Sequence, residues 1–354
     1  MKIAITADIH LQGSGGDSSR YKGLKNILEN LAEDGIDNII IAGDLFDKDM
    51  ENYAKFEKIT REYGDTSFYI IPGNHDPDIK GEKFSSNNIK PVTGSPKILN
   101  FDSTQFVMVP YRPGVAMGEE LEKVVGKIKK DRPWVLIGHG DWLGNIDNRN
   151  LYEPGIYMPL TDQDRKIYRP DKIFLGHIHK PLSEDDLYYP GSPVPMDITE
   201  TGKRRYLIVD TKNLRVKSRP VKTDILYFTA ELTLLPVEDE ESYLKNEIKK
   251  VKEEWDLTQV QKEKTEIRVK VSGFTKNKKK ITRLVKERFS GFKFYNNREP
   301  DTVDLNFAGN SQKSEIAELT VNWMEENLKW NFNKPDSPDK EKVVLDIMKI
   351  IYQK

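Results

Sequence analysis

Short apolar runs alternate with stretches of helical periodicity over the first two-thirds of the chain. The apolar runs are rich in β-branched residues and are bounded by Gly, Pro or Asp, a pattern typical of buried strands. Strands are predicted at residues 3–7, 36–42, 68–72, 106–110, 134–137, 173–175 and 206–209. A helix is predicted between the first two strands, where Leu24, Ile27, Leu28 and Leu31 recur at helical spacing, and another at about 50–63. This alternation indicates βαβ units in a layered α/β domain.

The pattern changes after about residue 220, where a small α+β unit and then further helices are predicted. In order, the expected elements are a strand (225–235), a charged helix (243–255), a strand with alternating apolar residues (Ile267, Val269 and Val271), a basic helix (about 278–288), a helix (314–328), a loop (331–338) and a short amphipathic helix (343–351). The domain limits are therefore expected at 1–220, 221–309 and 310–354.

Composition narrows the class of protein. A chain of 354 residues suggests about two domains. It has no apolar run long enough to span a bilayer, and its N-terminus begins as a strand rather than a signal peptide. We therefore expect a cytoplasmic location and no membrane partner. The sequence contains no cysteine, which excludes disulfides and thiolate metal sites.

Every one of the five histidines follows a predicted strand and has Asp, Asn or Gly within three residues. The polar groups at strand ends are Asp8-Ile9-His10, Gly43-Asp44, Gly73-Asn74-His75-Asp76, Gly138-His139-Gly140-Asp141 and Gly176-His177-Ile178-His179. A single histidine at a strand end is usually an ordinary loop residue. Five histidines that all obey the same pattern are difficult to obtain by chance, so a shared site is predicted.

The shared site has the chemistry of a metal centre. Functional groups gather at the carboxyl ends of strands in open α/β sheets. The Asp–x–His and His–x–His spacings place two side chains on the same side of an extended segment, and the glycines permit tight turns and close backbone approach. Imidazole, carboxylate and amide oxygen suit Mn, Fe or Zn. The donors outnumber the needs of one ion, which favours a two-metal site for phosphoryl displacement.

The five groups, in this order and spacing, resemble the motifs of the calcineurin-like metallophosphoesterase superfamily over residues 1 to about 180. The resemblance implies a two-sheet sandwich flanked by helices, two divalent ions and hydrolysis of phosphate esters by a metal-bound hydroxide. It implies that one ion is held by Asp8, His10, Asp44 and His179, and the other by Asp44, Asn74, His139 and His177, with Asp44 bridging. His75 would be catalytic, lying over the scissile phosphate. Asp76 and Asp141 are expected to support ligands or turns.

Secondary features are similar to those of the SbcD/Mre-eleven family of DNA double-strand break repair nucleases. They are Gly43-Asp44-Leu45-Phe46-Asp47, Tyr189-Pro190-Gly191-Ser192-Pro193 and the strand at 205–210. This resemblance implies an α+β capping domain, Mn as the ion, DNA as substrate, an SbcC-type coiled-coil ATPase partner and a homodimer. At the position of Asp47, archaeal and eukaryotic relatives carry a histidine that is associated with positioning the DNA end, whereas bacterial members often have Asp.

The second domain carries a local excess of positive charge. Residues 262–299 contain 13 Lys and Arg against 4 Asp and Glu, although the whole chain has a net charge of −1. The candidate DNA-binding side chains are Lys276, Lys278, Lys279, Lys280, Arg283, Lys286 and Arg288. A solvated helix face is the other interpretation of this charge. The terminal helix at 343–351 is expected either to dock a partner or to pack on its own domain.

The leading functional prediction is a metal-dependent DNA exo- and endonuclease. The alternative is a phosphodiesterase or phosphatase acting on a small substrate, such as a cyclic nucleotide, with the basic surface incidental. A catalytically silent DNA-bridging scaffold is a third possibility, against which the complete set of site motifs argues.

Overall fold

The computed structural model describes residues 1–13, 18–48, 52–144, 155–234, 239–308, 311–327 and 340–352. They form two compact units. The first comprises Met1–Met196 with Lys203–Asp224, and the second comprises Asp197–Gly202 with Ile225–Lys354. The C-terminal helices thus belong to the second unit. Among the described residues, no helix combines the length and apolarity required to cross a membrane.

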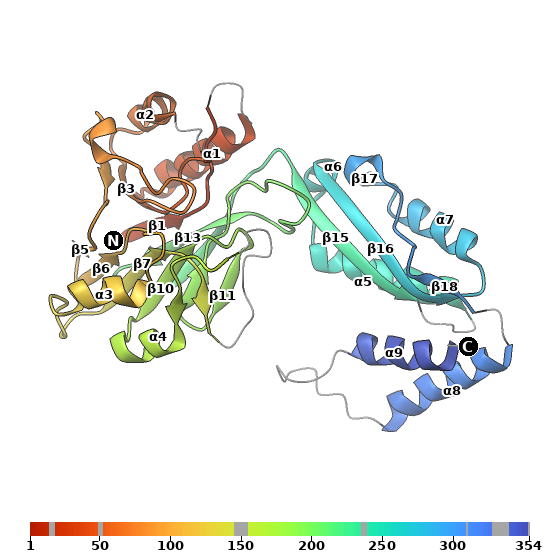
Figure 1. Cartoon of the computed structure of the whole chain (residues 1–354). Coiled ribbons are helices and arrows are strands. Elements are labelled where there is room, and N and C mark those ends of the chain that lie inside the picture. Colours follow the sequence, from red (N-terminus) through yellow and green to blue (C-terminus); the bar gives the residue numbers. More distant parts are fainter. Residues whose placement is uncertain are drawn as a thin grey trace. The chain divides into compact units, whose positions relative to one another are not determined.

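The first unit contains two six-stranded sheets (Figure 1). The first sheet has the order β14 (Val216–Pro220), β13 (Arg205–Asp210), β1 (Lys2–Thr6), β2 (Asn38–Ala42), β3 (Ser67–Ile71) and β4 (Ile89–Pro91). The second has the order β11 (Leu182–Glu184), β12 (Leu187–Tyr189), β10 (Lys172–Gly176), β7 (Trp134–His139), β6 (Thr104–Met108) and β5 (Lys97–Phe101). The central strands of both sheets run parallel, from β1 to β4 and from β12 to β6.

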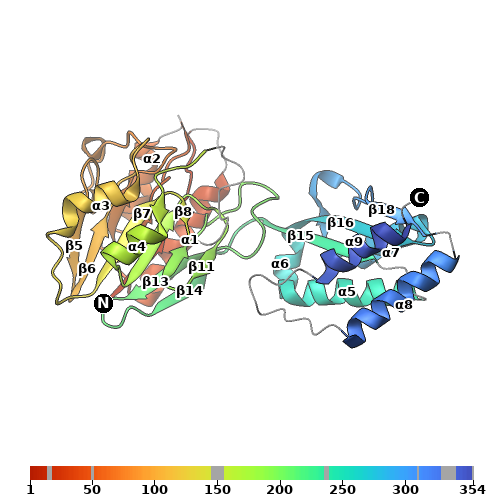
Figure 2. The same ribbon diagram turned by 60° about the horizontal axis from the view of Figure 1, so that its bottom comes forward.

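Three apolar layers hold the first unit together. The first sheet packs α1 (Ser18–Asp34) and α2 (Tyr53–Glu62) on its outer face, and Leu24, Ile27, Leu28 and Leu31 form the buried side of α1. The two sheets pack face to face through a second layer. The second sheet covers its outer face with α3 (Met117–Val125), and α4 (Asp162–Tyr168) follows beside it (Figure 2). Each central strand is buried on both faces, which explains its continuous apolar run.

The predicted two-sheet sandwich flanked by helices is therefore confirmed. All seven predicted strands of this unit and both helices are present, with ends shifted by up to a few residues. The edge strands β4, β5, β11 and β14, and β12 next to β11, were not predicted, because they are short and carry no long apolar run. The antiparallel pairing of β13 with β1 was not predicted either, since it joins two segments that are far apart in sequence.

The second unit is the predicted smaller α+β domain. Its sheet consists of the parallel strands β15 (Leu226–Leu234), β16 (Thr265–Thr275), β17 (Lys293–Phe294) and β18 (Leu305–Phe307). The predicted helices are α5 (Glu240–Trp255) and α7 (Lys278–Arg288), with a short α6 (Gln259–Glu263) between α5 and β16. The residues that alternate along β16 bury one face against α5 and α7. Each βα connection thus returns the chain to a parallel neighbour.

The C-terminal helices are α8 (Ser311–Asn327) and α9 (Lys340–Tyr352). The buried residues of α9, Val344 and Met348, pack with Ala317 and Met324 of α8 and with Phe274 of β16. Of the two interpretations of the terminal helix, the structure supports packing on its own unit. The loop predicted at 331–338 lies outside the described residues.

Candidate metal centre

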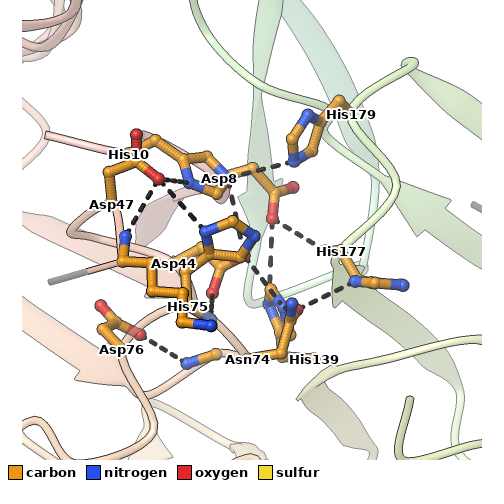
Figure 3. Close-up of polar contacts among 12 residues, drawn as sticks. Asp8, His10, Asp44, Asp47, Asn74, His75, Asp76, His139, His177 and His179 are labelled. Atoms are coloured by element: carbon orange, nitrogen blue, oxygen red, sulfur yellow. Dashed lines mark hydrogen bonds and ion pairs between the residues drawn. The ribbon is translucent and has the colours of Figure 1, made fainter. Parts of the chain in front are cut away.

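The polar groups singled out by the sequence converge at the carboxyl ends of β1, β2, β3, β7 and β10 (Figure 3). These strands come from both sheets, so the site lies at the edge of the sandwich where the carboxyl ends of the two facing sheets lie together. Most of its side chains are buried, including those of His10, His139 and His177. The fold therefore creates one cluster of imidazole, carboxylate and amide groups.

One half of this centre is formed by Asp8, His10, Asp44 and His179, whose donor atoms lie within 4.8 Å of one another. The Nε2 atoms of His10 and His179 are 3.1 Å apart. His10 Nε2 also lies 3.5 Å from Asp44 Oδ2. Two imidazole nitrogens this close that also face a carboxylate oxygen can share one divalent ion, since metal–nitrogen bonds are about 2.0–2.1 Å long.

The other half is formed by Asn74, His139 and His177 around the same carboxylate. Asn74 Oδ1 lies 2.8 Å from His139 Nε2 and 3.0 Å from His177 Nδ1. His139 Nε2 lies 3.4 Å from Asp44 Oδ2. Asp44 therefore faces both halves, which is the position required of a bridging ligand.

The donor set fits divalent ions. Asp8 Oδ2 and Asp44 Oδ2 are buried and have no hydrogen-bond partner within the described part of the chain. A buried carboxylate oxygen without a partner is costly unless a cation compensates it. Burial acts to raise the pKa of Asp44, but the imidazole of His139 outweighs burial and keeps the pKa well below the usual value. The carboxylate is thus held in the ionised form that metal binding needs.

Four of the converging residues have a left-handed backbone. The φ angles are 54° for Asp8, 49° for His10, 51° for Asp44 and 100° for His177. The explanation by an extended Asp–x–His segment is therefore wrong, because the turns after β1 and β10, rather than a strand, aim these side chains. Positive φ is unfavourable for residues other than glycine, and such strain is concentrated at functional sites.

Glycines provide the close approach that was predicted. Gly43 has φ +88°, and a Cβ there would lie 2.1 Å from His139 Nδ1. A Cβ on Gly73 would lie 2.1 Å from Asp44 Oδ1. The side chains of the centre occupy the space that any larger residue at these two positions would need.

His75 lies at the edge of the centre and contacts an aspartate that the sequence did not assign to the site. Its Nδ1 is 3.2 Å from Asp47 Oδ1, and its ring is 4.6 Å from that of His10. Asp47 also accepts hydrogen bonds from Gln12 and Arg20, each at 3.0 Å. Burial acts to raise the pKa of Asp47, but the polar groups around it lower the pKa far below its usual value.

From the sequence, Asp47 was noted only as the position where archaeal and eukaryotic relatives carry a histidine, and not as part of the metal site. It lies three residues after Asp44, in the same loop that follows β2. Its contact with His75, however, joins loops after two different strands, and Arg20 comes from α1. No local pattern indicates such contacts.

Asp76 supports the turns, as expected. It is buried, and its carboxylate accepts hydrogen bonds from the backbone N–H groups of Gly73 at 2.7 Å and Phe46 at 3.0 Å. Burial, together with the nearby Asp44 carboxylate, raises the pKa of Asp76 to about 7. Asp76 thus ties together the loops that carry Asp44 and Asn74.

The basic residues predicted to bind DNA lie on or just before α7 and are exposed. Three of them are paired with acids: Lys280 with Glu241, Arg283 with Glu287 and Lys286 with Glu299. Within the described ranges, the side chains of Lys276, Lys278 and Lys279 form no ion pair. These three lysines lie just before and at the start of α7, and Arg288 is exposed at its end.

Comparison with known families gives the class of the protein. The model of the calcineurin-like phosphoesterase family matches residues 1–181, which is more than half of the chain, and the chain belongs to this family. Proteins of this family use divalent metals, in agreement with the cluster around Asp44. The predicted membership of the calcineurin-like superfamily is confirmed. The resemblance to SbcD/Mre-eleven nucleases stays a prediction.

Similar proteins are more distant. The chain is 26% identical over 213 residues to YhaO, an uncharacterized metallophosphoesterase of Bacillus subtilis, and the match covers 55% of this chain and 50% of that protein. The chain thus spans about half the length of this relative. No substrate follows from the similarity.

Solved structures with similarity to the chain include proteins described by different activities. One is a phosphodiesterase described as archaeal (16% identity, TM-score 0.35, covering 62% of this chain and 100% of that one). Another is a dimetal phosphatase from Danio rerio (9% identity, TM-score 0.43, covering 62% of this chain and 96% of that one). A third is the nuclease MPE from Pseudomonas putida (20% identity, TM-score 0.26, covering 42% of this chain and 65% of that one). With TM-scores this low, these similarities do not distinguish between substrates.

The packing around Gly73 provides a test of the centre. Gly73→Ala places a Cβ against Asp44 Oδ1 and must displace this carboxylate. We expect affinity for Mn²⁺ to fall about 10- to 100-fold, the range observed when the support of a metal ligand is lost. Equilibrium dialysis measures the effect. Gly126→Ala is the control, because a Cβ there would meet no atom within 4 Å. Wild-type affinity in Gly73→Ala would show that the carboxylate does not need this space.

Proposed function

We propose that the protein is a two-metal phosphodiesterase that degrades DNA as the nuclease subunit of a repair complex. The observation that carries this proposal is the convergence of six further metal-ligand candidates around Asp44, with His75 beside them (Figure 3). Asp8, His10, Asp44 and His179 would hold one ion. Asp44, Asn74, His139 and His177 would hold the other.

The bound ions, His75 and Asp47 would have different roles in phosphodiester hydrolysis. Divalent ions, when bound, supply Lewis-acid stabilisation of the phosphate oxygens and a nucleophile at neutral pH. His75 is not needed as a ligand, and its ring is 23% exposed and can reach a substrate. Asp47 accepts a hydrogen bond from its Nδ1–H, which directs Nε2 away from Asp47; in the imidazolium form Nε2 also carries a proton, which it can give to the leaving oxygen. Mn is the proposed ion, because it accepts both imidazole and oxygen ligands.

DNA as the substrate is supported by the second unit. The exposed lysines at the start of α7 can bind phosphates without reading sequence. The order of the units, with the phosphoesterase first and an α+β unit and two helices after it, agrees with the resemblance to repair nucleases. One observation favours the alternative, a small-substrate phosphodiesterase or phosphatase. Lys280, Arg283 and Lys286 are paired with acids, so the basic surface is weaker than the sequence suggests.

The partner proposal concerns α8. Ile316, Leu319 and Trp323 recur at helical spacing along this helix and are 53%, 63% and 59% exposed. An adjacent side of α8 packs on α9 through Ala317 and Met324. An apolar helix face of this kind fits a groove or a second helix. We propose that this face, rather than α9, docks a coiled-coil ATPase.

Degradation of DNA tests the proposed reaction. Wild-type protein loaded with Mn²⁺ is expected to degrade linear duplex or single-stranded DNA. His75→Ala should keep both ions, because it removes no ligand, and should lose about 10²- to 10⁴-fold in rate. Gel assays and metal analysis of the same samples measure both quantities. Hydrolysis of a cyclic nucleotide by a metal-loaded protein that leaves DNA intact would favour the small-substrate alternative. Loss of metal in His75→Ala would make His75 a ligand.

The basic surface is tested by salt dependence. Lys276, Lys278 and Lys279 replaced together by Ala should weaken binding to every duplex sequence. The slope of log K against log salt should become shallower by about 1 for each lost phosphate contact. A matched control replaces Lys245, Lys249 and Lys250 of α5, which removes the same charge from lysines already paired with acids. If both triple variants weakened DNA binding equally, the α7 lysines would contribute only through the net charge of the protein and would not form a specific binding surface.

The docking face is tested with the SbcC-type ATPase of the same organism. Trp323→Ser should reduce its affinity at least about 30-fold, because an exposed aromatic anchor typically contributes 2 kcal/mol or more to an interface. Val260→Ser is the control, since Val260 is also an exposed apolar residue (63%) but lies on α6. Calorimetry measures the affinity. Unchanged binding in Trp323→Ser would exclude this face of α8.

A further inference from the structure

Asp141 and Tyr157 are joined to each other beside the metal centre. The carboxylate Oδ2 of Asp141 accepts a hydrogen bond from the backbone N–H of Tyr157 at 2.7 Å. In return, the N–H of Asp141 donates to the carbonyl oxygen of Tyr157 at 2.8 Å. Asp141 is 2% exposed. The pair is extended by β8 (Trp142–Leu143) and β9 (Leu160–Thr161), which run parallel to each other.

Both members of this pair contact the imidazole of His177. Asp141 Oδ1 lies 3.6 Å from His177 Nε2, at ion-pair distance. The ring of Tyr157 lies over the imidazole, with centroids 4.9 Å apart and an angle of 41° between the planes. The other ring nitrogen of His177, Nδ1, points into the centre, 3.0 Å from Asn74 Oδ1. One contact is on the edge of the imidazole and the other on its face.

We propose that Asp141 and Tyr157 are positioning residues that fix His177 for metal binding; the inference rests on the proposed role of His177 as a ligand. A negative carboxylate beside Nε2 favours the tautomer with the proton on Nε2. This tautomer leaves the lone pair of Nδ1 available to the ion. The Tyr157 ring restricts rotation of the imidazole about its Cβ–Cγ bond. Carboxylates that orient metal-ligating histidines in this way raise both ligand basicity and metal affinity.

The geometry argues against Asp141 as a ligand itself. Oδ2 is occupied by the backbone of Tyr157, and Oδ1 lies on the side of His177 opposite to the nitrogen that faces Asn74. Gly140 shows that the arrangement is built into the fold. Its φ is +152°, and a Cβ there would lie 2.5 Å from the carbonyl oxygens of Tyr157 and Met158. The Gly-His-Gly-Asp motif thus provides a ligand, a close approach and a carboxylate that holds a second ligand.

Replacing Asp141 by Asn tests the effect of the carboxylate on the His177 tautomer without changing the size of the side chain at position 141. The Asn side chain has the same size, and its oxygen can still accept the hydrogen bond from Tyr157. Its NH₂ group would then face Nε2 and favour the other tautomer, in which a proton occupies Nδ1. Titration calorimetry with Mn²⁺ should show two ions bound by the wild type. In Asp141→Asn the affinity for one ion should fall about 10- to 100-fold, while the other ion is bound as before. The absorption spectrum of bound Co²⁺ should change as well.

Two further variants test the ring. Tyr157→Leu keeps both backbone hydrogen bonds and removes the ring, so a several-fold loss of affinity at the same ion is expected. Tyr157→Phe restores the ring and should bind like the wild type. Asp131→Asn is the charge control, because Asp131 is an exposed acid in the loop before β7. Circular dichroism verifies that each variant is folded.

The outcomes are distinct. Wild-type affinity for both ions in Asp141→Asn, or a loss equal to that of Asp131→Asn, overturns the inference and leaves the metal ligands in place. If Asp141→Asn does not fold, the Tyr157 variants decide. Equal metal affinities of Tyr157→Leu and Tyr157→Phe would then overturn the inference. A folded wild-type protein that binds fewer than two ions would overturn the proposed two-metal centre itself.

Discussion

The structure depends on the burial of two carboxylates, Asp8 and Asp44, among imidazoles at a single point. Each has an oxygen with no hydrogen-bond partner in the part of the chain that is described. Burial of such charge is expensive in the absence of cations. The backbone of the site is strained as well. Four of its residues have a left-handed conformation: Asp8, His10, Asp44 and His177. A site that concentrates so much unfavourable free energy is explained by the binding of divalent ions.

The two-sheet sandwich determines where such a buried cluster of charged side chains can form. Parallel strands of both sheets end at the same place, so short loops suffice to bring donors from five strands together. Asp76 joins the loops after β2 and β3, and Asp141 joins the loop after β7 to the segment that contains Tyr157. Carboxylates next to the ligand positions therefore hold the loops, while the buried strands hold the sheets. The chemistry and the packing are separated along each strand, with apolar residues inside it and polar residues immediately after it.

The second unit has its own core, formed by β15, β16, α5 and α7. It carries surface chemistry of two kinds: exposed lysines at the start of α7 and an exposed apolar face on α8. Neither is explained by the stability of the unit. They are the features on which the proposals of a polyanionic substrate and of a protein partner rest.

The sequence by itself determined the strands and helices with long apolar patterns, the family and the set of residues around Asp44. This was possible because strand burial and polar strand ends are local properties of the chain. The tertiary structure decided how those residues are aimed, since the left-handed turns at Asp8 and His10 replace the expected extended segment. It also decided which residues act on the ligands from outside. The contacts of Asp47 with His75, of Arg20 with Asp47 and of Tyr157 with His177 join separate loops and helices. Contacts of this kind arise only when distant segments pack together, and no local pattern encodes them.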